Sequence, residues 1–185
     1  MTRPAVTFEG TLASSPLIPS AKLPPTILAE TLLREWELHA ARPTLPEHRP
    51  ALLAQLAELC ASLQPGADIA IDYEDLRSVL HSAAHFRVGT YATAGPNRAI
   101  STARALLAAV QKPQLASVGP AQRALLNIIS PAAEPLHMDE LTLIIETLQH
   151  TLGQDAELIF GHDETTDSAV AELRGWLLVG YRTCA

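Results

Sequence analysis

The sequence predicts an α/β protein: a two-layer domain in which a mixed four-stranded sheet is packed by helices, preceded by a helical N-terminal extension. Two observations lead to this class. From Phe86 onward, apolar runs of strand length alternate with segments whose apolar residues recur every three or four positions, the period of a helix. Before Phe86 the helical period dominates. With 48% hydrophobic residues among 185, the chain is large enough for one core.

Composition argues against several classes of function. The formal net charge is −7 and only 4% of residues are aromatic, whereas a nucleic-acid surface needs basic stripes and stacking rings. No run approaches the ~18–20 apolar residues of a membrane-spanning helix, and no secretion signal is visible. Cys60 and Cys184 are too few for a disulfide framework and lack zinc-binding spacing, so we expect a core residue and a tail thiol. A cytoplasmic protein without nucleic-acid or membrane partners is expected.

The first part of the chain, residues 1–44, is rich in proline. Eight of the 14 prolines fall within the first 50 residues, which favours extended chain over residues 1–24. A helix is expected from Thr26 to about Arg42, because one apolar stripe recurs there at four-residue spacing and should pack inside the protein. The stripe consists of Leu28, Leu32 and Trp36.

A second helix is expected within residues 45–67. Thr44 and Glu47 match a T-x-x-E capping box, and Pro46 falls in the first turn, where its missing N–H costs nothing. The run ends at Gly66. Since a bare apolar helix face is unfavourable in water, we expect the N-terminal extension to fold back over it. Its apolar residues are Leu52, Leu53, Leu56, Leu59, Cys60 and Leu63.

The third part, residues 68–185, supplies the sheet. A short extended connector leads to a helix with Leu76, Val79, Leu80 and Ala83 on one face. Strands are then expected at 86–91, 124–129, 157–161 and 173–181, with helices at 97–110 and 138–152.

The last strand carries apolar residues on both faces, which places it in the centre of the sheet. Strands separated by helices favour parallel pairing, whereas the last two strands, joined by the acidic segment 163–167, are expected to form a hairpin.

Several strings, in their order and spacing, resemble the C-terminal half of FtsZ, the bacterial relative of tubulin. In that family they correspond to the loop after the long central helix, the start of a sheet-packing helix and three strands. The resemblance covers about residues 49–182, with the second helix as the end of the central helix. The strings are Asp72-Tyr73-Glu74-Asp75-Leu76, Gly95-Pro96-Asn97-Arg98-Ala99-Ile100, Leu125-Leu126-Asn127-Ile128, Ala156-Glu157-Leu158-Ile159-Phe160-Gly161 and Leu177-Leu178-Val179-Gly180-Tyr181.

The resemblance does not extend to the nucleotide-binding half of FtsZ. FtsZ binds GTP with a separate N-terminal domain whose signature is a glycine-rich phosphate loop. Here the segment before Leu52 is short and its only glycine is Gly10, although glycines are what let backbone N–H groups approach phosphate closely. We therefore expect no GTP binding, no other cofactor and no catalysis in cis.

The other half of the family's shared active site is kept in part. In FtsZ and tubulin, acidic side chains of the loop after the central helix reach the nucleotide of the neighbouring subunit. The family pattern N-x-D-x-x-D keeps both carboxylates here, as Asp72 and Asp75, and has Ala70 in place of the asparagine. A carboxylate can accept a proton from water or hold a magnesium-bound water beside a phosphate.

The resemblance thus implies Asp72 and Asp75 as residues that act in trans, within a partner-binding surface that also includes Asp68 and Glu74. The structural alternative is that Asp72 is the N-cap of the following helix and Asp75 only favours its first turn.

Other polar patterns are less specific. His81 and His85 have the i, i+4 spacing of a metal pair on one helix face, but without a third ligand two solvent-facing histidines are commoner. Arg98 is expected at the surface or an interface rather than on a phosphate. The acidic segment 163–167 could bind a cation, although an acidic hairpin tip is more often solvated.

The resemblance implies a non-catalytic binding or regulatory module that acts on FtsZ-type filaments in bacterial cell division, for example by occupying a filament end. The expected partner is full-length FtsZ or a related filament protein, and self-association is also considered. Two alternatives stay open: a homo-oligomeric small α/β domain that binds a metabolite at a subunit boundary, or a relative retained for contact with an unrelated protein.

Overall fold

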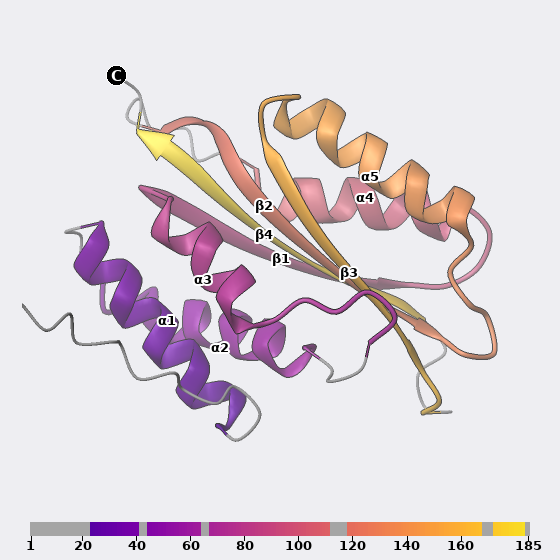
Figure 1. Cartoon of the computed structure of the whole chain (residues 1–185), viewed down its shortest axis with the longest axis horizontal. Helices are drawn as coiled ribbons and strands as arrows, with labels where there is room; N and C mark the ends of the chain where they lie inside the picture. Colours follow the sequence, from indigo (N-terminus) through magenta and orange to yellow (C-terminus); the bar gives the residue numbers. More distant parts are fainter. Residues whose placement is uncertain (1–22, 41–43, 64–66, 112–117, 168–171, 184–185) are drawn as a thin grey trace, which may run out of the picture.

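The computed structural model of the protein describes residues 23–40, 44–63, 67–111, 118–167 and 172–183. The extended segment expected at the N-terminus lies outside them up to residue 22, as does Cys184. The described residues form α1 (Pro25–His39), α2 (Arg49–Ala61), α3 (Tyr73–His81), β1 (His85–Thr93), α4 (Arg98–Ala109), β2 (Val118–Pro131), α5 (Met138–Leu152), β3 (Glu157–Thr165) and β4 (Leu173–Thr183) (Figure 1).

The four strands form one mixed sheet in the order β1-β4-β2-β3. As the two apolar faces of β4 predicted, this strand lies inside the sheet, antiparallel to both β1 and β2. The expected hairpin between β3 and β4 is wrong. Because α5 carries the chain back along the sheet, β3 pairs parallel with β2 and lies at the edge. Asp163 and Glu164 therefore belong to β3 and not to a hairpin tip.

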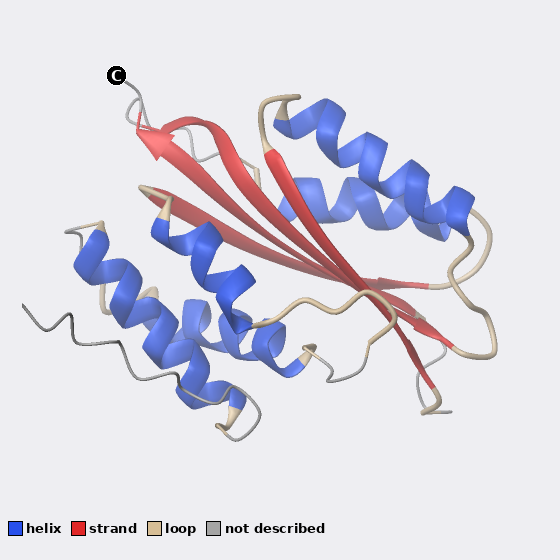
Figure 2. Ribbon diagram, viewed as in Figure 1, coloured by secondary structure: helices blue, strands red, loops and turns tan. Residues whose placement is uncertain are grey.

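Helices cover both faces of the sheet, which gives three layers where two were expected (Figure 2). α1, α2 and α3 lie on one side, and α4 and α5 on the other. Successive residues of β4 point into different cores: Leu178 packs with the first group of helices and Leu177 with the second. The sheet is thus buried between two apolar clusters, which explains the apolar runs of its inner strands.

α1 packs on α2, as expected for an N-terminal extension that folds back. Its predicted stripe is buried, and the indole N–H of Trp36 donates a hydrogen bond to the oxygen of Ala83 at 3.0 Å. The Trp36 ring also meets Phe86 edge to face, with centroids 4.8 Å apart. α1 is therefore anchored to the start of the sheet as well as to α2.

The expected capping box at the start of α2 is wrong. The helix begins at Arg49, with Pro50 in its first turn. The backbone N–H of Thr44 donates instead to Glu37 of α1 at 3.0 Å, and Arg49 reaches the same carboxylate at 2.6 Å. The start of α2 has no side-chain cap and is held instead by the ion pair between Arg49 and Glu37 of α1.

Candidate functional site

The candidate site is the acidic connection, which we define as residues 67–75 between α2 and the first turn of α3. It runs beside the edge strand β3 (Figure 1). The backbones of Ile69 and His162 exchange two hydrogen bonds of 3.0 Å. A Cβ at Gly161 would lie only 3.0 Å from the oxygen of Ile69, so this glycine permits the close approach. The acidic connection is thus fixed to the sheet.

The carboxylates of Asp72 and Asp75 form a reciprocal cap at the start of α3. Asp72 accepts a hydrogen bond from the backbone N–H of Asp75 at 3.1 Å, and Asp75 accepts one from the N–H of Asp72 at 2.9 Å. Such a cap contributes about 1 kcal/mol. Each bond uses one oxygen of its carboxylate, and among the described residues the other oxygen has no partner. Capping is therefore compatible with contact to another molecule.

The other two acidic residues of the acidic connection differ in their surroundings. Asp68 is 67% exposed, with one oxygen 3.9 Å from Nδ1 of His162. Glu74 is 69% exposed and lies 3.3 Å from Arg77, which also holds Glu35 of α1 at 2.9 Å. Surface pairs of this kind contribute little to stability. Both carboxylates are largely exposed, so the acidic connection presents negative charge at the surface.

Two buried polar contacts that support the acidic connection are not evident from the spacing of the sequence. Asn127 of β2 donates from Nδ2 to the oxygen and the hydroxyl of Ser62, which caps α2. Ser130 lies 3.0 Å from Nε2 of His162. In the sequence, the only hint of these contacts is a polar residue inside an apolar strand. Such a residue predicts a hydrogen-bond partner, because burial of a polar group without one is unfavourable. The first contact holds the end of α2, and the second holds His162, whose backbone is bonded to Ile69 of the acidic connection.

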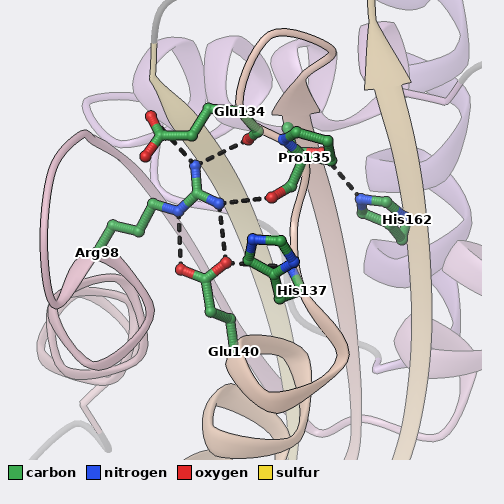
Figure 3. A network of polar contacts seen from close by, with 7 residues as sticks. Arg98, Glu134, Pro135, His137, Glu140 and His162 are labelled. Carbon is green, nitrogen blue, oxygen red and sulfur yellow. Dashed lines mark hydrogen bonds and ion pairs between the residues drawn. The ribbon is translucent and has the colours of Figure 1, made fainter.

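Arg98 is a buried structural residue, not the surface or interface residue expected. Its side chain is only 3% exposed and binds both oxygens of Glu140 at 2.8 Å (Figure 3). It also donates to the backbone oxygens of Glu134 and Pro135. The hydrogen bonds from Arg98 lower the pKa of Glu140. With its donors occupied, Arg98 joins α4 to the start of α5.

The two histidines proposed as a metal pair do not share a helix face. α3 ends at His81, and His85 is the first residue of β1. The ring of His81 instead stacks on His39 of α1, with centroids 3.9 Å apart. Over the part of the chain that the structure describes, no group of three His, Cys, Asp or Glu residues could hold a metal ion, which applies equally to the acidic end of β3.

Among the described helices, none is both long and apolar enough to cross a membrane.

The layered fold defines the structural class: it is the α/β fold of FtsZ/tubulin-like domains. Two FtsZ structures from M. jannaschii, a point mutant and an empty dimer, match with TM-scores of 0.55 and 0.54 at 18% and 19% identity. The matches cover 75% and 78% of this chain but 42% of each FtsZ chain.

A GTPγS-form protofilament of TubZ from Bacillus thuringiensis serovar israelensis is similar with a TM-score of 0.51 at 11% identity, over 71% of this chain and 36% of that chain. The chain thus spans about two fifths of the length of these structures and shares their fold. No family model and no curated protein matches the sequence. The FtsZ/tubulin-like fold that the sequence strings implied is confirmed.

Proposed function

We propose that this protein is a binding module that acts on FtsZ-type filaments, with the acidic connection as its docking surface. The observation that supports this most directly is the exposure of Asp68, Asp72 and Glu74 after α2 in a chain with the FtsZ fold. In FtsZ and tubulin the corresponding loop reaches the nucleotide of the next subunit. Two of the similar structures are themselves an FtsZ dimer and a TubZ protofilament.

The proposed role is to meet a nucleotide held by another molecule. The only glycine before α2 is Gly10, so this chain offers no glycine-rich loop there for phosphate. The acidic connection could nevertheless face the nucleotide-bearing end of a filament subunit, where Mg²⁺ and basic groups favour carboxylates. Occupying that end would block the addition of the next subunit.

The proposed module is non-catalytic. Ala70 stands where the family pattern has asparagine, so one amide hydrogen-bonding group is missing beside the carboxylates. Catalysis requires groups held in the correct geometry, and the loss of one positioning group lowers the rate more than it lowers docking. Bound protein should therefore reduce GTP turnover by the filament.

The direct test adds the protein, at equimolar ratio, to polymerising FtsZ from the same organism. Light scattering and GTP turnover per FtsZ should both fall, because each capped end stops growing. If neither changes at this ratio, the proposed function is wrong.

A matched pair of variants separates docking from folding. Asp72→Asn with Asp75→Asn keeps an oxygen acceptor at both cap positions but removes both charges, so the filament effect should disappear while the melting temperature changes little. Asp72→Ala with Asp75→Ala should lose the cap as well. Asp139 is an exposed residue of α5, so Asp139→Asn is the control for loss of charge and should retain the effect on filaments. Full inhibition by the double Asn variant would contradict docking through these carboxylates.

A further inference from the structure

A cavity of about 710 Å³ opens where several strand ends meet the last turn of α2. Residues of all four strands line it, together with Thr166 after β3 and Glu172 before β4. The volume is in the range of sites that take small molecules or short peptide segments, about 300–1,000 Å³. We refer to it as the strand-end cavity. It is distinct from the acidic connection, none of whose residues line it.

The lining of the strand-end cavity is strongly acidic. Four carboxylates contribute to it, Glu58 from α2, Asp163 and Glu164 from β3, and Glu172 before β4. None of them forms an ion pair with another described residue. Among the described residues that line the cavity, Arg174 is the only basic one. The excess of negative charge favours a cationic ligand.

Two aromatic side chains complete the lining. Tyr91 of β1 is 37% exposed, and Trp176 of β4 has an indole N–H that is buried without a hydrogen-bond partner among the described residues. Aromatic faces attract cations, and guanidinium groups stack on them most readily. Because the indole nitrogen itself is inaccessible, it is the ring of Trp176 that faces the cavity.

We propose that the strand-end cavity binds an arginine side chain of a peptide segment. A metal ion is the poorer match, because no three ligating side chains of the described residues come together there. A guanidinium spreads its charge over a planar group with five donors, so it can meet carboxylates that are apart while one face stacks on an aromatic ring. The proposal rests on the residues of this cavity and does not depend on the filament function.

The test uses an acetylated and amidated peptide with two arginines separated by two glycines. The matched ligand has citrulline in place of arginine, which keeps the shape and removes the charge. With only two tryptophans in the chain, ¹⁵N-labelled protein should give two indole N–H signals, and Trp176→Phe assigns them. The arginine peptide should shift the Trp176 signal while that of Trp36, bonded to Ala83, stays in place.

The variant for this test is Asp163→Asn with Glu164→Gln, which keeps side-chain size and should weaken binding of the arginine peptide at least tenfold. Glu146→Gln, exposed on α5, is the control and should leave the dissociation constant unchanged. Equal binding of the citrulline peptide, or no shift of the Trp176 signal at millimolar arginine peptide, would overturn the proposal. So would an unchanged affinity in the double variant.

Discussion

The side-chain amide of Asn127 donates hydrogen bonds to both the backbone oxygen and the hydroxyl of Ser62, at 3.0 and 2.9 Å. Asn127 lies in the middle of β2 and is 4% exposed, and Ser62 follows the last residue of α2. This contact ties the end of α2 to the sheet just before the acidic connection starts. The position of the candidate site therefore depends on a polar group inside the core.

Replacing Asn127 with leucine should destabilise the protein by about 1–3 kcal/mol, because both acceptors on Ser62 lose their buried donor. Ser62→Ala should cost less, since the backbone oxygen keeps its bond. Urea unfolding monitored by circular dichroism measures both. Equal stability of Asn127→Leu and the unmodified protein would show that the contact contributes nothing.

Gly161→Ala should displace the acidic connection. The new Cβ would lie 3.0 Å from the backbone oxygen of Ile69 and from both γ carbons of Ile71, so one backbone must move. Overpacking of this kind costs about 1–3 kcal/mol. Hydrogen exchange at the amide of Ile69, which is bonded to His162, should become faster. Unaltered exchange there would mean that the sheet edge accommodates a methyl group.

The Arg98–Glu140 pair should be sensitive to removal of either partner. Arg98→Ala should lower stability by about 3–5 kcal/mol, because it leaves Glu140 and two backbone oxygens without their donor. Arg98→Lys should recover only part of this, since an ammonium cannot form the same two-pronged contact. Thermal unfolding followed by circular dichroism compares the variants, and full rescue by lysine would contradict a geometric role.

The same pair predicts an acid-dependent loss of stability. Hydrogen bonding by Arg98 lowers the pKa of Glu140 below 4.5 in the folded protein, so unfolding raises the affinity of this carboxylate for protons. Its contribution is therefore complete above about pH 4.5 and is lost as the pH falls through the lowered value. Stability measured between pH 6 and pH 3 should fall less steeply in Glu140→Gln. Identical slopes in the two proteins would contradict this assignment.

His81 should make the packing of α1 depend on pH. Burial, followed by the nearby His39 and Arg77, lowers the pKa of His81 below 6.5, with Glu35 and Glu74 opposing the shift. Protonation then favours the unfolded chain, so stability is highest above about pH 6.5 and declines as the pH falls toward the lowered pKa. His81→Gln should flatten the profile between pH 7 and pH 5, whereas exposed His150→Gln on α5 should not.

The thiol of Cys60 reports on the opening of α2. Burial raises its pKa to about 12, so the reactive thiolate is scarce at pH 8. In a Cys184→Ser background, labelling by a thiol-specific disulfide reagent should be slow in the native protein and fast in denaturant. Rapid labelling of native protein would show that α2 separates readily from the core.

Local features of the sequence were sufficient for most helices and strands. The periodicity of α5 predicted the observed bounds of that helix. The two-faced apolar pattern of β4 predicted the inner position of that strand in the sheet. The cap formed by Asp72 and Asp75 was also predictable, because N-cap preferences act over three residues. Together with the FtsZ-like strings, these features determined the fold class and singled out the acidic connection.

Only the tertiary structure decided which strands pair and which polar residues meet. Arg98 and Glu140 are 42 positions apart and Asn127 and Ser62 are 65 apart, distances at which no spacing rule operates. The parallel pairing of β3 with β2 across α5 followed from the alternation of strands and helices, whereas the position of β4 between β1 and β2, away from β3, did not. Helix periods and caps depend on neighbouring residues, whereas strand order and buried polar pairs depend on how the whole chain excludes water from both faces of the sheet.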